Sequence, residues 1–307
     1  MAATLLRRLR DLATLLFGLT LVLFVMLRFA GDPVVVMAGP DATPEQMALL
    51  SEQYGLDRPL PWQFIVYLGN VLTLDFGQSM STGRPAMSVV LDMLPATLLL
   101  TFLALGFTLL VSIPLGAWLG VRRRTLPRRI VSAGVFILQG APGFVVGLLL
   151  IQVFAVRLGW LPSLGYGTVM HWILPTLSLA AFLAPKLTRV LAANVSEAMR
   201  EDHIRTARAS GATPRELLLR HALPNALLGA TALVGTQFAF LISGTVVIEL
   251  LFSWPGIGWL LVESTQTLDF PVVQSVAIVV AILVFTVNLL TDVCFRLLDP
   301  RLRAVGR

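Results

Sequence analysis

Long apolar stretches separated by short charged segments dominate the pattern of this chain. A helix needs about 20 mostly apolar residues to cross the hydrocarbon core of a bilayer. Six stretches approach or exceed that length: 12–27 (extending toward Ala30), the residues between Asp92 and Arg122, 130–156, 172–190, 225–248 and 270–291. The first is long for a signal peptide, and no small-residue cleavage site follows it, so we expect it to be retained. The pattern predicts an all-α, polytopic membrane protein with six transmembrane helices.

Composition supports this interpretation. The 307 residues are 56% hydrophobic and 13% charged, whereas soluble domains carry about a quarter charged residues. An ordinary cytosolic enzyme is therefore excluded, and so is a disordered chain, which needs low hydrophobicity. The single cysteine, Cys294, excludes an internal disulfide and a cysteine-based zinc site.

The basic residues indicate orientation. With the N-terminus inside, nineteen of the 23 lysines and arginines fall in cytoplasmic segments, among them Lys186, Arg189 and the anchoring run Arg122–Arg124. The four exceptions are Arg28, Arg58, Arg84 and Arg157. The positive-inside rule then predicts both termini in the cytoplasm. The net charge of +6 is explained by topology, so the expected partner is the lipid bilayer and not nucleic acid.

The segment 31–93 is the one long external segment. Thr43-Pro44-Glu45-Gln46 predicts a capped helix start, and Trp62, Phe64 and Tyr67 are expected to pack at the membrane interface or to dock an external partner. We divide the chain into an N-terminal helix with this external segment (1–93), a five-helix core (94–295) and a cytoplasmic tail (296–307).

The cytoplasmic loop 191–224 carries the most information. Glu201 and Arg205 have the spacing of a favourable helical ion pair, and Gly211 interrupts the helix. Thr213-Pro214-Arg215-Glu216 then predicts a capping box that starts a second helix. A connector needs only about 2–8 residues, so we expect this rigid elbow to contact a partner.

This loop resembles the "EAA" signature of ATP-binding-cassette (ABC) importer permeases, in which glycine, nine residues, isoleucine, one residue and Leu-Pro follow one another. Gly211, His221, Leu223 and Pro224 match that spacing, with histidine in place of isoleucine and Arg205 in place of the first glutamate. Residues 200–211 resemble the dipeptide, oligopeptide and nickel branch. Further matching motifs are Gly31-Asp32-Pro33, 54–60, 75–79, 94–98, 252–258, 269–274 and Asp299-Pro300-Arg301.

The resemblance implies a type I ABC importer permease fold in a bacterial inner membrane, with a cytoplasmic coupling helix. It implies as partners a paralogous second permease subunit, two cytoplasmic ABC ATPase subunits and a periplasmic or lipid-anchored solute-binding protein. The elbow would be the coupling helix, because closure of the ATPases can move the membrane helices only through a stiff element that contacts both. The residues expected to couple to the ATPase are Arg205, Ala207, Arg208, Ala209, Gly211, Ala212, Leu223 and Pro224.

Other chemistry is sparse in this sequence. There is no GxxxxGK[ST] phosphate loop, so ATP and Mg are expected in the partner ATPases, with no cofactor and no enzymatic activity in this chain. His171, His203 and His221 lack metal-ligand spacing, so no metal site is predicted. Glu249, at the end of a span and expected to reach water, could form an external gate with Trp254, Pro255 and Gly256.

The most favoured function is a permease subunit that forms half of the pathway of an ATP-driven importer for di- or oligopeptides. A nickel or metal-chelate importer of the same family is the alternative, because residues 159–167, His171 and 173–175 resemble the nickel branch. A stand-alone secondary transporter is less favoured, because the sequence shows no clear repeat and no mid-bilayer carboxylate. An intramembrane enzyme would need a catalytic set, and none is present.

Overall fold

The computed structural model describes residues 2–30, 34–35, 42–53, 55–121 and 125–298. The motifs Gly31–Pro33 and Asp299–Arg301, the run Arg122–Arg124 and the tail beyond Leu298 lie outside these residues. The chain forms two compact units. The first contains Met1–Pro95 and Leu260–Phe285, and the second contains Ala96–Trp259 and Thr286–Arg307.

The described residues are almost entirely helical, with one isolated bridge between Gln78 and Pro85. The elements in chain order are α1 (Ala2–Ala30), α3 (Pro44–Gln53), α4 (Leu60–Thr73), α5 (Ala86–Val121), α6 (Leu126–Gly140), α7 (Gly143–Leu150), the π-helical η1 (Ile151–Arg157), α8 (Val169–Ala198), α9 (Asp202–Ala209), α10 (Pro214–Glu216), the π-helical η2 (Leu217–Ala222), α11 (Leu223–Phe252), α12 (Ile257–Gln266) and α13 (Phe270–Leu298).

Among the described residues, four continuous helices are long and apolar enough to cross a membrane, and three bent helix pairs raise the possible number of spans to seven. The four are Leu6–Met26, Ala86–Val121, Val169–Ala198 and Phe270–Val293. The expected span 130–156 is not one continuous helix, because α6 and the α7–η1 segment meet at 106°. Pro142 stands at this break with an extended backbone, and proline cannot continue the hydrogen bonding of a helix.

The fourth apolar stretch also differs from expectation. We predicted that the span ends at about 190, whereas the helix α8 continues to Ala198. The cytoplasmic position of Lys186 and Arg189 stays a prediction. Both basic side chains find amide partners on neighbouring helices. Lys186 Nζ donates to Gln237 Oε1 at 3.1 Å, and Arg189 Nη1 donates to Gln139 Oε1 at 2.6 Å.

In the first unit, α4 packs against α1 through aromatic rings. Phe64 makes edge-on contacts with Phe17 and Phe24, and Tyr67 stacks on Phe24 with the ring centroids 5.9 Å apart. Of the predicted interfacial aromatic residues, Trp62 is exposed whereas Phe64 and Tyr67 make these contacts. The predicted cap of α3 is confirmed, because Thr43 and Gln46 exchange backbone and side-chain hydrogen bonds.

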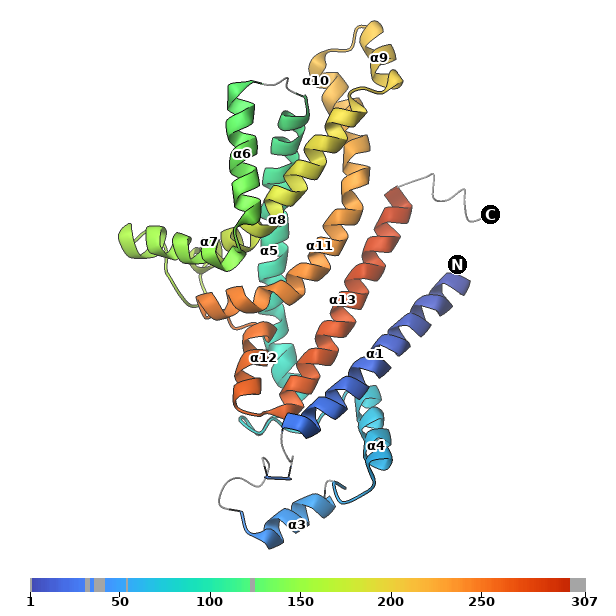
Figure 1. The fold of residues 1–307 in the computed structure, drawn as a ribbon, viewed down its shortest axis with the longest axis vertical. Coiled ribbons are helices and arrows are strands. Elements are labelled where there is room, and N and C mark those ends of the chain that lie inside the picture. Colours follow the sequence, from blue (N-terminus) through green and yellow to red (C-terminus); the bar gives the residue numbers. More distant parts are fainter. Residues whose placement is uncertain (1, 31–33, 36–41, 54, 122–124, 299–307) are drawn as a thin grey trace. The chain divides into compact units, whose positions relative to one another are not determined.

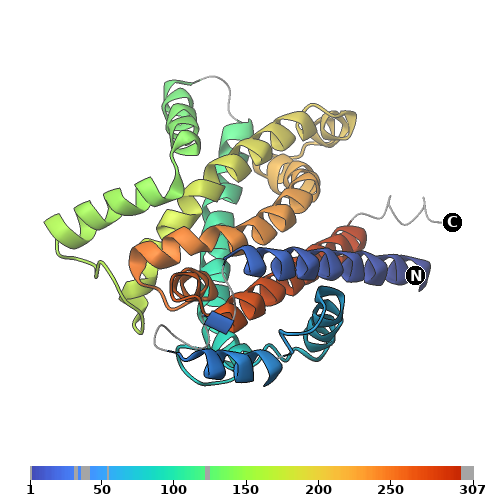
Figure 2. The same ribbon diagram turned by 60° about the horizontal axis from the view of Figure 1, so that its bottom comes forward.

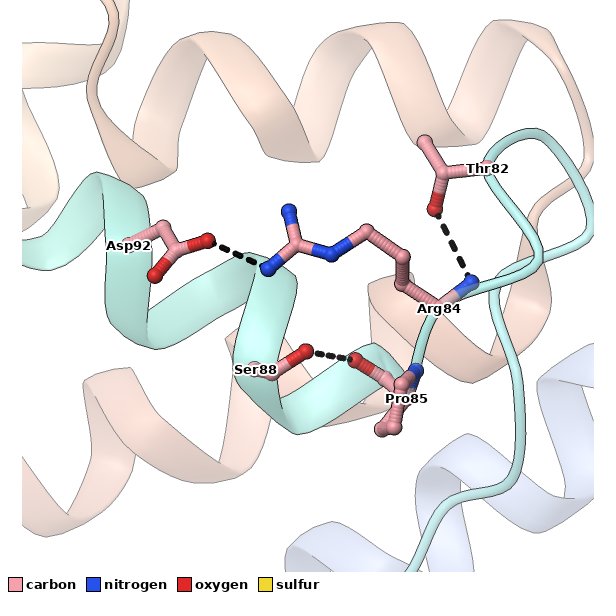
Figure 3. Close-up of polar contacts among 5 residues, drawn as sticks. All are labelled: Thr82, Arg84, Pro85, Ser88 and Asp92. Atoms are coloured by element: carbon pink, nitrogen blue, oxygen red, sulfur yellow. Dashed lines mark hydrogen bonds and ion pairs between the residues drawn. The ribbon is translucent and has the colours of Figure 1, made fainter.

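A tight turn precedes α5 in the same unit (Figure 3). Arg84 Nη2 contacts Asp92 Oδ2 at 2.7 Å, one side chain from the turn and one from the helix, and the Arg84 amide donates to Thr82 Oγ1 at 3.4 Å. The hydroxyl of Ser79 donates to the buried carboxylate of Asp269 at 2.6 Å. These bonds fix the start of α5.

In the second unit, α8 packs against α6, α7 and α11 (Figures 1 and 2). Its core includes Leu100, Leu183 and Leu241, which are almost fully buried. Two glycines of α5 bring that helix close to α8. A Cβ atom at Gly116 or at Gly120 would lie 2.7 Å from Leu191 Cβ or Val195 Cβ. Small residues of this kind allow close helix packing in membrane proteins.

Candidate functional site

The predicted elbow is present as a distinct helical segment, which we define as residues 199–224. It leaves the end of α8, forms α9, turns at Gly211 and returns through α10 and η2 into α11. Figure 1 shows α9 and α10 beyond the ends of α8 and α11. The elbow therefore connects directly to two of the packed helices of its unit.

Gly211 ends α9 in the way that the sequence predicts. Its φ of +89° lies in the left-handed region, where a side chain causes strain. The Gly211 amide donates to Arg208 O and the Ala212 amide donates to Ala207 O, both at 3.1 Å. This pair of bonds is a Schellman motif, which satisfies the last carbonyl groups of a helix.

The predicted capping box at Thr213 is confirmed. The Glu216 amide donates to Thr213 Oγ1 at 3.3 Å, and the Thr213 amide donates to Glu216 Oε2 at 2.9 Å. Pro214 occupies the first helical turn, where its missing N–H is not needed. Two well-satisfied helix ends thus meet at one short turn, which makes the elbow stiff.

The elbow also has a small apolar core. Ile204 and Leu217 are buried in it together with Ala198 and Ala222, and Ala207 and Ala212 pack against them. We expected Ala207 and Ala212 to permit close approach of a partner. Both are half-buried and pack against this core.

The remaining predicted coupling residues lie on the outside of the elbow. Arg205, Arg208, Ala209, Gly211 and Pro224 are exposed, whereas Leu223 is half-buried. These positions present two guanidinium groups beside a surface of small residues.

The predicted ion pair between Glu201 and Arg205 is wrong. Glu201 stands just before α9 in an extended conformation, so helical spacing does not apply to it. Arg205 instead pairs with Asp202 at 3.1 Å, and Glu201 contacts His203 Nδ1 at 3.0 Å.

The predicted gate residues form a second cluster, which we call the Glu249 cap. The amides of Gly258 and Trp259, at the start of α12, donate to Glu249 Oε2 at 2.8 and 3.0 Å. The Thr97 hydroxyl of α5 donates to Glu249 Oε1 at 2.7 Å and accepts from the Ile257 amide at 2.9 Å. One carboxylate from α11 therefore occupies the N-terminus of α12, where backbone N–H groups and the helix dipole favour negative charge.

Trp254 and Gly256 complete this cap. The fully buried Trp254 donates its indole N–H to Ala96 O at 2.9 Å. A Cβ atom at Gly256 would overlap the carboxylate of Glu249, so this position requires glycine. Pro255 is half-buried between them. The structure brings together all four of the predicted gate residues.

Our expectation that Glu249 reaches water is wrong, because its side chain is 0% exposed. The chain bends back after Phe252 and places the start of α12 over the carboxylate. Thr97 was not singled out as a site residue, although it stands in the Leu94–Leu98 motif. Its spacing from Glu249 in the sequence gives no signal of the contact.

The described part of the chain contains no group of three or more histidine, cysteine, aspartate or glutamate residues that could hold a metal ion. His171 Nδ1 lies 2.7 Å from Thr168 Oγ1, the hydroxyl at the start of α8.

Comparisons with known proteins agree with these features. Residues 112–304 match the family described as binding-protein-dependent transport system inner membrane component, and residues 1–101 match its N-terminal family. The chain is 36% identical over 298 residues to the glutathione transport system permease protein GsiC of Escherichia coli (strain K12), covering 97% of each chain. It is also 36% identical to GsiC of Salmonella typhi over 94% of this chain and 95% of that protein.

Two solved structures share the fold. One is a chain of the methionine ABC transporter MetNI in an inward-facing conformation, with a TM-score of 0.58 and 22% identity over 69% of this chain and 97% of that chain. The other belongs to an amino acid ABC transporter. Its TM-score is 0.52 and its sequence identity is 18%, and the match covers 70% of this chain and 94% of that chain. The chain therefore belongs to the binding-protein-dependent transport system inner membrane component family and is a permease subunit of an ABC importer.

Proposed function

We propose that this permease forms half of the translocation pathway of an importer for short peptides, including peptides of the glutathione type. The observation that carries this proposal is the 36% identity to GsiC over 97% of both chains. Glutathione is a tripeptide, so its carriers and those of dipeptides and oligopeptides face similar chemistry. The similarity extends along the whole length and includes every span.

The elbow is the proposed coupling element. Its two helix ends are satisfied by a Schellman motif and a capping box, and its core holds α9 against η2. A stiff segment of this kind can pass a displacement to α8 and α11 without bending. The exposed Arg205 and Arg208 supply donors for carboxylate or carbonyl groups on an ATPase surface.

The proposed assembly contains a paralogous second permease, two cytoplasmic ATPase subunits that bind ATP and Mg, and a periplasmic or lipid-anchored binding protein. We place both termini and the elbow in the cytoplasm, because the basic residues gather there under the positive-inside rule. Within this assembly the Glu249 cap, at the opposite end of α11 from the elbow, is the proposed external gate.

Uptake in cells tests this proposal. A strain without its own peptide and nickel importers would express the chain with its cognate partners, and uptake of labelled glutathione, a labelled dipeptide and labelled nickel would be measured. The matched control replaces the catalytic glutamate of the ATPases by glutamine. We expect uptake of glutathione or of the dipeptide, and its loss in the control.

The other outcomes separate the parts of the proposal. Uptake of nickel alone would move the substrate to the metal or metal-chelate class while leaving the coupling scheme intact. Peptide uptake that survives inactive ATPases would contradict the ATP-driven mechanism.

A further inference from the structure

Lys186 lies in α8, a helix that is long and apolar enough to cross a membrane. It stands twelve residues before Ala198, the end of α8, which corresponds to about 18 Å of helix at 1.5 Å per residue. Its partner Gln237 stands near the middle of α11, which runs from Leu223 to Phe252. The bond to Gln237 therefore holds the ammonium group beside the middle of α11.

The Lys186 side chain is nevertheless on the surface of its unit. It is exposed, whereas Gln237, whose amide oxygen holds the ammonium at 3.1 Å, is buried. An ammonium group has three N–H donors, and the bond to Gln237 uses one of them. A cation that faces hydrocarbon within a span is unfavourable, so such residues line water-filled cavities or subunit interfaces.

The helices α6, α8 and α11, which lie around Lys186, carry few acidic residues. Helix α6 has no acidic residue, α8 has only Glu197 near its end, and α11 has only Glu249, whose carboxylate is committed to the start of α12. Arg189, one turn from Lys186 toward the elbow, adds a second exposed cation. The surface along these helices is thus positively charged.

Aromatic rings border the cations. Phe182 and Phe240, on α8 and α11, stack with centroids 5.6 Å apart and are 37% and 54% exposed. The guanidinium of Arg189 lies over the ring of Phe136 at 5.7 Å. A cation held by an amide and flanked by open aromatic surface is suited to a small amphipathic anion, since the charges attract and the rings contact apolar groups.

We propose that Lys186, oriented by Gln237, binds a carboxylate of the peptide as it passes through the permease. The inference rests on the proposed function, because short peptides are the substrates that bring a carboxylate into the pathway. Charge-assisted N–H···O bonds to carboxylates are stronger than neutral ones, so the ammonium group of Lys186 can hold a carboxylate.

Direct ligand binding tests the site. The complete importer complex would be reconstituted in lipid nanodiscs without the binding protein or ATP, and the binding of labelled glutathione and of its diethyl ester would be compared. We expect wild type to bind the free acid at least about tenfold more tightly than the ester, as a charged hydrogen bond implies. Lys186→Met should abolish this difference while leaving ester binding unchanged, and Lys186→Arg should preserve most of it.

The control is Arg200→Met, which removes a cation from the elbow and should change neither affinity. Equal binding of acid and ester by wild type, no saturable binding of the acid, or an equal loss of both ligands in Lys186→Met would overturn the site. ATP-dependent uptake of glutathione by the same complex in vesicles is measured separately. The proposed function therefore stands or fails independently of this result.

A second measurement tests the exposure of Lys186 to water. In a Cys294→Ser background, Lys186→Cys should react with a charged, water-soluble thiol reagent, as detected by the mass increase of the protein. Leu110→Cys, at an exposed apolar position of α5, is the control and should react at least about tenfold more slowly, because thiol reagents attack a solvated thiolate. Equal, slow reaction at both positions would place Lys186 against lipid and overturn the proposal.

Discussion

The elbow and the Glu249 cap are built on opposite principles. The elbow is mostly exposed, and its defining hydrogen bonds join residues within five positions of each other, from Ala207 to Ala212 and from Thr213 to Glu216. The Glu249 cap is buried, and the bonds of Thr97 in it join residues 152 and 160 positions apart. The first holds its own shape, whereas the second exists only when three helices are in place.

This difference suits the two proposed roles. A coupling element must stay rigid while it moves, and the hydrogen bonds within the elbow move together with it. A gate must change when the helices around it move, and bonds between helices respond to that movement. Because unsatisfied buried groups are more unfavourable than solvated ones, substitutions at the cap should mainly reduce stability, and substitutions at the elbow should mainly reduce coupling.

The largest effect is expected from Glu249→Ala. It leaves the amides of Gly258 and Trp259 without their acceptor in a buried place. Each unsatisfied buried group costs about 1–3 kcal/mol, so the free energy of unfolding should fall by about 3 kcal/mol or more. Thermal unfolding of the purified complex measures this. An unchanged melting temperature would show that the cap does not stabilise the fold.

The elbow could be predicted from the sequence because its signals are local. A glycine followed by a Thr-Pro-x-Glu box specifies a helix end and a helix start, and both formed as expected. The partners of Arg205 were predicted wrongly because the prediction extended α9 through Glu201, where the backbone is extended.

The cap could be predicted only in part. Glu249, Trp254, Pro255 and Gly256 are near each other in the sequence and were grouped, but burial depends on the bend between α11 and α12. The contact with Thr97 depends on how α5 packs, which no local pattern encodes. The same limit explains Lys186, because its contact with Gln237 depends on how α8 and α11 pack.

The next effect is expected from Gly256→Ala. The added methyl group would overlap the Glu249 carboxylate, and overpacking of this kind costs about 1–3 kcal/mol. The matched control is Gly244→Ala in α11, where the new atom would lie 3.8 Å from Phe240 and make an ordinary contact. Thermal unfolding should show a loss for the first substitution and no loss for the second. Equal behaviour of the two would contradict the close packing at the cap.

Gly211→Pro should separate coupling from stability. Proline cannot adopt the φ of +89° and removes the amide that bonds to Arg208, so the end of α9 must rearrange. Because the elbow is local, global stability should fall by only about 1 kcal/mol, while ATP-dependent uptake falls to the level of the inactive ATPase control. Gly211→Asn, which tolerates this conformation, is the control and should retain uptake. If both variants transport like wild type, the elbow is not the coupling element.

The smallest effect on stability is expected at Arg205, and it gives the sharpest test of a contact. Its ion pair with Asp202 is exposed on both sides, and such pairs contribute about 0–1 kcal/mol. Arg205→Met and Asp202→Asn both remove this pair, so both should leave the melting temperature nearly unchanged. If Arg205 contacts the ATPase, only Arg205→Met should weaken co-purification of the ATPase and reduce uptake. Equal effects of the two substitutions would mean that the ion pair within α9 matters and that Arg205 does not bind the partner.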